Sequence, residues 1–541
     1  MESTPLAHLP GDCWLQILEY LPQQDLNSLS RATHDTRGSV EPFLYRSIYW
    51  DWKQPPVRKI LLLLRTISER PKLAQYIRHV SLVWWDVESQ GTEISSPKGD
   101  LNWAKSVLQF RPTLRWARKV VRDAKFPTKF DTKWITRLFD GDAYAYATLL
   151  ISQLHNLRSL RLDFSFVLEG GFPGEMLHHA LFGNAPPGTL SRFSKLEMAD
   201  YGSNFPLTRF QEGVSLGRTS QFIPWFHLPS LKTLELWLYS VEGICIFPAE
   251  MPKISLNLPN LRSLVIAKTR VLPGDITRLL SQLPYLKSLH VGMAYQCRAT
   301  AEFLKEPECL LRSLENLGQA IEHLSISMEL LPCCAESFLQ RAIDDGGRPF
   351  HGMLKKFPNL KTASLPLNFL IGWDITAYRL RDVLPSTLEA LHIRADLWQI
   401  TNLIEFEMEA LEALESLMRH KQRGSLPSLR TFSYQGQHEY NDTELAALGF
   451  EADFKYSYLI KREALNLFCH RQGYKLFSQY GDCTPDFMVR GATLVDNIVH
   501  RLPWPFVRVD ELPASVPRHL RTASIKSSDQ QSNDANPAGP N

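Results

Sequence analysis

The clearest catalytic pattern in the chain is a G-x-S-x-G motif formed by Gly213, Ser215 and Gly217. In α/β-hydrolases this motif places a nucleophilic serine on a sharp turn between a strand and a helix. Here it lies in polar, loop-like sequence, and Pro224 follows shortly afterwards. A serine hydrolase is therefore the least favoured of the functions considered for this chain.

Cysteine and histidine could also supply chemistry, as zinc ligands or nucleophiles. Cys333-Cys334 and Cys469-His470 are adjacent in sequence rather than spaced for a tetrahedral zinc site, and Cys309 does not complete a ligand set. The 8 cysteines include no C-x-x-C pair, which is typical of reduced thiols. The chain also lacks a phosphate-binding loop, an H-E-x-x-H motif and an EF-hand loop. We therefore expect no catalytic, metal or cofactor site, and a protein that is not an enzyme.

Composition indicates a globular protein rather than a disordered one. The 541 residues carry a net charge of +3, with 44% hydrophobic and 22% charged residues. A nearly neutral chain of this size has no global field that attracts nucleic acid or an anionic membrane. The apolar run at 60–64 is far shorter than the roughly 18 residues of a membrane span, and the N-terminus does not resemble a secretory signal. We expect a cytoplasmic and/or nuclear protein.

The most informative pattern is a repeated frame, L-x-x-L-x-L, in which other apolar residues replace some leucines. From 157 onward, successive copies begin 25 to 41 residues apart. The copies lie at 77–82, 157–162, 193–198, 231–236, 261–266, 286–291, 321–326, 360–365, 388–393 and 429–434.

Each copy has the alternation of a strand with one buried face. A proline precedes several copies by two residues, as Pro229 precedes Leu231, and marks a loop that leads into the strand. Helical spacing appears between copies, for example at Ile276, Leu279 and Leu283. The sequence thus predicts an α/β fold, an irregular leucine-rich-repeat-like solenoid with parallel strands on its concave face and helices on its convex face. The alternative is an ordinary α/β domain with leucine-rich strands.

In such a strand the residues between the leucines point away from the core, onto the concave face. These positions, which also include Glu197, Val265 and Ser325, carry both signs of charge, imidazoles and an aromatic ring, a mixture that suits a protein partner. The alternative is that they are ordinary solvated strand positions. The candidate substrate-binding residues are Arg161, Glu235, Trp237, His290, His392 and Arg394.

The first fifty residues differ from the repeat. Trp14, Leu15, Leu18 and Leu21 recur at helical spacing until Pro22 ends the helix, and a second short helix carries Leu26 and Leu29. A closing stretch, EPFLYRSI, leads into the solenoid. Three short helices bury little surface alone, so they need a partner or a neighbouring domain.

The segment LPGDCWLQILEYLPQQDLNSLSRAT resembles an F-box, and the trailing EPFLYRSI is similar to the ending found in many fungal F-box proteins. The resemblance implies a three-helix module that docks on a Skp-type adaptor, and through it on a cullin. The alternative is a cap that covers the first repeat of the solenoid. By position, the implied adaptor contacts are Leu9, Pro10, Ile17, Leu18, Leu21, Leu26 and Leu29.

The resemblance implies the substrate-recognition subunit of a Skp–cullin–F-box E3 ubiquitin ligase, in which the solenoid binds an unidentified target protein. The alternative is a leucine-rich-repeat scaffold with no ligase role. The expected organisation is an F-box (1–50), a connecting helix (51–75), the solenoid (76–440), a C-terminal cap (441–512) and a disordered tail (513–541).

A basic insertion near 95–148 interrupts the solenoid. Its basic residues outnumber its acidic ones, and aromatic residues are interleaved with them, so it could bind an acidic peptide, nucleic acid or an import receptor. The alternative is a solvated helix face. The basic residues are Arg111, Arg115, Arg118, Lys119, Arg122, Lys125, Lys129 and Lys133.

Overall fold

The computed structural model describes residues 10–84, 109–205, 218–247, 256–295, 308–330, 350–372, 379–394 and 426–434, with shorter pieces between 299 and 420. The chain divides into two compact units. One contains the described residues 10–44, and the other contains those from Tyr45 onward. Each unit is described separately below.

The first unit consists of three helices, as predicted: α1 (Gly11–Tyr20), α2 (Gln23–Ala32) and α3 (His34–Leu44). Leu21 leaves the helical conformation because the following residue is Pro22, which disfavours helical geometry in the residue before it. A small core contains Leu18, Leu26 and Val40. The helices therefore have a core of their own.

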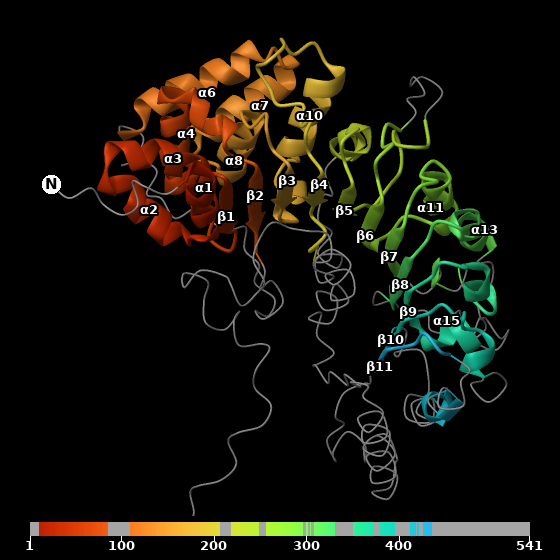
Figure 1. The fold of residues 1–541 in the computed structure, drawn as a ribbon. Coiled ribbons are helices and arrows are strands. Elements are labelled where there is room, and N and C mark those ends of the chain that lie inside the picture. Colours follow the sequence, from red (N-terminus) through yellow and green to blue (C-terminus); the bar gives the residue numbers. More distant parts are fainter. Residues whose placement is uncertain are drawn as a thin grey trace, which may run out of the picture. The chain divides into compact units, whose positions relative to one another are not determined.

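The second unit is built on a sheet in which every pair of neighbouring strands is parallel (Figure 1). Its eleven strands follow one another in sequence order, so each pairs only with its predecessor and successor. This order is that of a solenoid. The strands are β1 (Ser47–Asp51), β2 (His79–Val83), β3 (Ser159–Leu162), β4 (Met198–Tyr201), β5 (Thr233–Trp237), β6 (Ser263–Thr269), β7 (Ser288–Tyr295), β8 (His323–Leu330), β9 (Thr362–Pro366), β10 (Ala390–Arg394) and β11 (Thr431–Tyr434).

Helices connect successive strands and cover one face of the sheet (Figure 1). They are α4 (Val57–Glu69), α6 (Arg111–Asp123), α7 (Thr128–Phe139), α8 (Ala143–Ser152), α9 (Ser165–Leu168), α10 (Phe172–Phe182), α11 (Pro273–Leu280), α13 (Glu308–Leu317) and α15 (Leu367–Ile371). Several connections contain short 3-10 helices instead: η2 (Pro71–Gln75), η4 (Thr219–Gln221), η5 (Ile223–His227), η6 (Met353–Lys356) and η8 (Leu380–Asp382). The predicted α/β solenoid fold is confirmed.

The repeated leucines occupy equivalent places in neighbouring strands. Leu234 is in register with Leu264, which continues to Leu289 and Leu324, and all four side chains are buried. The ten predicted copies correspond to β2 through β11. The copy at 193–198 is out of register by three residues, because Ala199 and Tyr201 take the two strand positions of the frame in β4.

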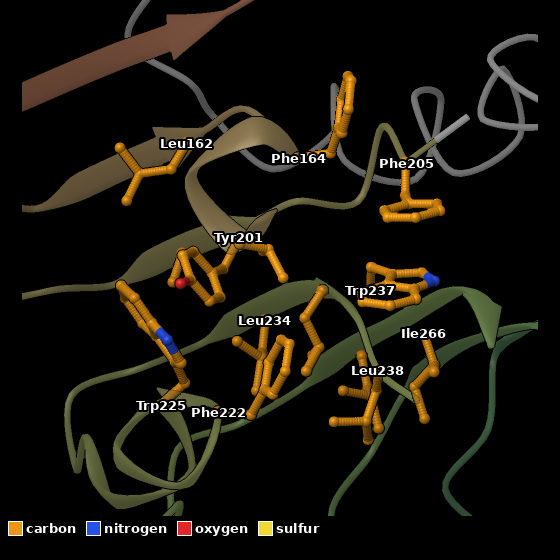
Figure 2. Packing of buried hydrophobic residues seen from close by; sticks show 14 of the residues in the cluster. Leu162, Phe164, Tyr201, Phe205, Phe222, Trp225, Leu234, Trp237, Leu238 and Ile266 are labelled. Atoms are coloured by element: carbon orange, nitrogen blue, oxygen red, sulfur yellow. The ribbon is translucent and has the colours of Figure 1, made fainter. Parts of the chain in front are cut away.

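Large aromatic side chains fill the core between β4, β5 and the chain that precedes β5 (Figure 2). The rings of Phe205 and Trp237 stack with centroids 4.1 Å apart and an interplanar angle of 7°. Tyr201 stacks on Trp225 at 5.0 Å. Such contacts add packing energy beyond the apolar area that they bury.

The sheet begins earlier than the sequence predicts, because β1 precedes the first predicted copy of the frame. The expected connecting segment, 51–75, contains α4 and η2, and the described part of the basic insertion contains α6, α7 and most of α8. The predicted C-terminal cap (441–512) and tail (513–541) lie outside the described residues. None of the helices in the described part of the chain has both the length and the apolar character needed to cross a bilayer.

Candidate functional site

The residues predicted to contact an adaptor occupy two different environments in the three-helix unit. Leu18 and Leu26 form its core, and Leu21 and Leu29 pack partly buried against that core. Ile17 and Pro10 are exposed, and Leu9 lies outside the described residues. Ile17 is thus the large apolar side chain of the predicted set that is available for contact.

Helix α1 exposes two further large side chains that the sequence analysis did not select. Tyr20 is 87% exposed and lies three residues after Ile17, so both are on one face of the helix. Leu15 is 47% exposed, close to the 39% of Ile17, but a spacing of two residues places it on a different face. Ile17 and Leu15 therefore have similar size and exposure on different faces of α1, and substitutions at the two positions can be compared directly.

The predicted concave residues lie in rows across the sheet, because each strand is in register with the next. Arg161 of β3 is paired with Asp200 of β4, which is paired with Glu235 of β5. The Arg161 Nη2 atom lies 3.8 Å from Glu235 Oε1. Burial raises the pKa of Asp200, and the nearby Arg161 charge opposes this effect. Arg161 thus forms an ion pair with Glu235, and its charge also acts on Asp200.

The same row continues through imidazoles and hydroxyls. His290 of β7 lies opposite Ser325 of β8, and its Nδ1 atom is 2.8 Å from Ser325 Oγ. Burial, reinforced by the Arg394 charge, lowers the pKa of His290 to about 3 and that of His392 to about 4. Arg394 itself donates through Nε to the Asp396 carboxylate at 2.9 Å. Both imidazoles are therefore neutral near pH 7.

The sequence predicts that these side chains are open to solvent, but most of them are less than a tenth exposed. Closely spaced parallel strands bring them into contact with one another, as the Arg161 and His290 contacts illustrate. Trp237 is fully buried because it stacks on Phe205, and its Nε1 donates to the backbone oxygen of Lys268 (Figure 2). Binding of a target protein by this row stays a prediction.

The repeat pattern places its copy at β4 three residues too early, and this changes the assignment of two acidic residues. The repeat pattern assigns Glu197 to the concave row, whereas Asp200 holds that position in the structure. Glu197 instead precedes the strand, and its backbone N–H donates to the oxygen of Arg158, which precedes β3. The cause is that Phe193, Leu196 and Met198 match the frame as well as the true set does.

Glu197 belongs to a row of charged residues that the repeat pattern does not predict. In every copy of the frame a charged residue immediately precedes the strand, and backbone hydrogen bonds join each to the next. A charged residue in the second position of each frame is the signal that could have revealed it. We call this row the charged ladder: Arg46, Arg78, Arg158, Glu197, Lys232, Arg262, Lys287, Glu322, Lys361, Glu389 and Arg430.

In the basic insertion, aromatic residues serve packing. Trp134 is buried, and Phe126 packs against it with ring centroids 5.2 Å apart. The guanidinium of Arg118 lies 3.5 Å from the ring centre of Phe139, and Lys133 donates to the backbone oxygen of Gly170. These interactions favour the solvated-face interpretation for α6 and α7.

The residues considered for catalysis lie mostly beyond the described parts of the chain. Ser215, Cys333-Cys334 and Cys469-His470 are outside them, whereas Cys309 is described as an exposed thiol. Among the described residues no cluster of three or more His, Cys, Asp or Glu side chains could hold a metal ion.

Comparison with known proteins does not assign the chain to a family. No protein-family model matches the chain, and no curated protein matches its sequence significantly.

Proposed function

We propose that this protein is the substrate-recognition subunit of a Skp–cullin–F-box E3 ubiquitin ligase. Helices α1–α3 bind a Skp-type adaptor, and the concave face of the parallel sheet receives a target protein. The observation that carries this proposal is a separate three-helix unit with its own Leu18–Leu26–Val40 core. Its α1 helix exposes Ile17, at a position where the F-box resemblance implies adaptor contact.

This role requires no catalytic residue in the chain itself. A receptor accelerates ubiquitin transfer by holding a target lysine close to a ubiquitin-loaded enzyme, which raises its effective concentration. The concave row offers fixed charges and hydroxyls rather than a mobile nucleophile, since Arg161 forms an ion pair with Glu235 and lies near the charge of Asp200. Most of these side chains are less than a tenth exposed, so a target would contact the polar atoms at their ends, which are already fixed in place.

The test is binding of the full-length protein to a purified Skp-type adaptor, measured by pull-down and by calorimetry. Ile17→Asp places a charge on the exposed apolar face of α1 and is expected to reduce adaptor affinity at least tenfold. Leu15→Asp is the matched control, since it makes the same change at similar exposure on another face of the helix. It is expected to retain wild-type affinity.

Circular dichroism of both variants establishes that the helices remain folded. Equal loss of binding in the two folded variants would contradict the proposed contact face. Absence of binding by the folded wild-type protein would overturn the ligase role and leave the scaffold alternative.

A further inference from the structure

Helix α6 carries a row of arginines along one side. Successive arginines are separated by four, three and four residues, the spacing that keeps side chains on the same side of a helix. A different side of α6 packs into the core through Ala117 and Val121. At the rise of an α-helix the row is about 16 Å long. We call it the arginine row: Arg111, Arg115, Arg118 and Arg122.

Most of this charge has no partner in the part of the chain that the structure describes. Arg118 lies over the ring of Phe139, 3.5 Å from the ring centre, but no ion pair reaches the other three guanidinium groups there. The first turn of α6 contains no acidic residue, and Asp123 comes only at the end of the helix. Arg111 is the first residue of α6, where the positive end of the helix dipole disfavours a cation.

Cations on other helices of the protein do have acidic partners. Arg278 of α11 lies 3.3 Å from Asp275, and Arg137 of α7 lies 3.1 Å from Asp142. By contrast, like charges four residues apart on a helix destabilise it. The arginine row therefore opposes the stability of α6, and folding alone does not account for it.

The neighbouring helix adds charge of the same sign. Helix α4 packs against α6 in the layer of helices that covers the sheet (Figure 1). Arg58, Lys59 and Arg65 of α4 are exposed, as is Lys119 of α6. None of these four side chains has an ion pair within the described residues, and the exposed acid of α4, Glu69, is its last residue. Both helices thus carry positive charge at their exposed positions.

The surroundings of the arginine row favour one class of partner. Neither α4 nor α6 exposes a large apolar side chain. Single-stranded nucleic acid is bound largely by stacking bases on exposed aromatic rings, and a helix that lies in a membrane interface inserts apolar side chains. With a net charge of +3 the chain also lacks the broad positive field that attracts nucleic acid. A flexible acidic polypeptide needs only the local charge of the arginine row.

We propose that the arginine row binds an acidic segment of another protein, which lies extended along α6. Alternate side chains of an extended segment point to the same side about 6.6 Å apart, close to the steps of about 4.5 to 6 Å along the arginine row. Each guanidinium presents a planar fork of N–H donors that matches the two oxygens of a carboxylate. The site does not depend on the proposed ligase role, because it uses no residue of α1–α3 or of the concave row.

The test is binding of the full-length protein to a fluorescein-labelled peptide in which four glutamates alternate with serines. Fluorescence polarisation is measured at low and at physiological salt. The same peptide with glutamine in place of glutamate is the uncharged control. We expect only the glutamate peptide to bind, with an affinity that falls as salt screens the charges.

The decisive variant is Arg115→Glu combined with Arg122→Glu, which reverses two charges of the arginine row. It is expected to weaken peptide binding roughly tenfold or more. The matched control is Arg192→Glu combined with Lys355→Glu, which makes the same change in net charge at exposed positions outside α4 and α6. This control is expected to retain nearly wild-type affinity. Circular dichroism establishes that both variants are folded.

A milder variant tests the role of the guanidinium fork. Arg115→Lys combined with Arg122→Lys keeps both charges on a folded helix, but a lysine offers no planar pair of donors to a carboxylate. It is expected to bind the glutamate peptide several-fold more weakly than wild type. Unchanged affinity in both this variant and the charge-reversal variant would overturn the proposal.

Other results would also contradict an acidic protein segment as the partner. Equal binding of the glutamate and glutamine peptides would exclude recognition of carboxylates. Equal loss of affinity in the two charge-reversal variants would show that net charge attracts the peptide, rather than the arginine row. A single-stranded oligonucleotide and phosphatidylserine vesicles are measured under the same conditions. Tighter binding of either one that is lost with Arg115 and Arg122 would overturn the proposal, because a different class of partner would occupy the arginine row.

Discussion

The carboxylate of Asp163, directly after β3, accepts a hydrogen bond from the backbone N–H of Trp84, directly after β2, at 3.0 Å. Its other oxygen accepts from the backbone N–H and the hydroxyl of Ser165, at 3.0 and 2.6 Å. Asn204, which follows β4, donates to the same carboxylate at 2.8 Å and accepts from the backbone N–H of Phe164. One buried acid thus joins the ends of three consecutive strands, where backbone groups leave the sheet.

Replacing Asp163 with alanine is expected to lower the free energy of unfolding by about 3 kcal/mol. The substitution leaves the buried N–H groups of Trp84 and Ser165 without their acceptor, and each unsatisfied donor costs about 1–3 kcal/mol. The measurement is equilibrium unfolding in denaturant. Asp140→Ala is the control, because Asp140 is an exposed carboxylate that follows α7. An equal loss in both variants would show that the hydrogen bonds of Asp163 carry no special weight.

Two helical glycines provide a second prediction about packing. A Cβ atom at Gly174 in α10 would lie 2.1 Å from the backbone oxygen of Gln221, whereas a Cβ at Gly274 in α11 has no atom within 4 Å. Gly174→Ala is therefore expected to destabilise the protein by roughly 2 kcal/mol or more, because backbone must move. Gly274→Ala is expected to be neutral or stabilising by up to about 1 kcal/mol, since alanine favours helix. Similar thermal midpoints for the two variants would contradict close packing of α10 on η4.

The frame predicted most of the sheet because any strand with one buried face needs apolar residues at fixed spacing. It missed β1, where Tyr45, Ile48 and Trp50 occupy the three positions of the frame without a leucine. It also shifted the copy at β4, where Ala199 fills a buried strand position that a leucine search passes over. Both errors have one cause: the core requires apolar volume at a position, and several residue types supply it.

The candidate sites were harder to predict because they depend on neighbours in the sheet rather than in the sequence. Alternation along β5 assigns Trp237 to the outer face, yet Phe205, from the chain beyond β4, stacks on it and buries it. Likewise Arg78 and Arg158 are far apart in sequence, and only the register of β2 and β3 brings their backbones together. A sequence pattern gives the face of a strand but not what lies beside it.

The ladder ion pairs predict how stability depends on pH. Hydrogen bonds from Lys287 and Lys361 lower the pKa of Glu322 to about 2, below its ordinary value of 4.5. The folded protein therefore favours the charged carboxylate, and its stabilising contribution is present above pH 4.5 and is lost as the pH falls through about 2. Glu322→Gln should be less stable than wild type at pH 7, and this difference should shrink as the pH falls below 4.5. Denaturant midpoints measured from pH 7 to pH 3 test this expectation.

The control is Glu315→Gln. Glu315 is a more exposed carboxylate that pairs with Lys356, so its loss should give a smaller difference in stability at pH 7. A gap between wild type and Glu322→Gln that stays constant with pH would show that the charge of Glu322 contributes nothing to the ladder.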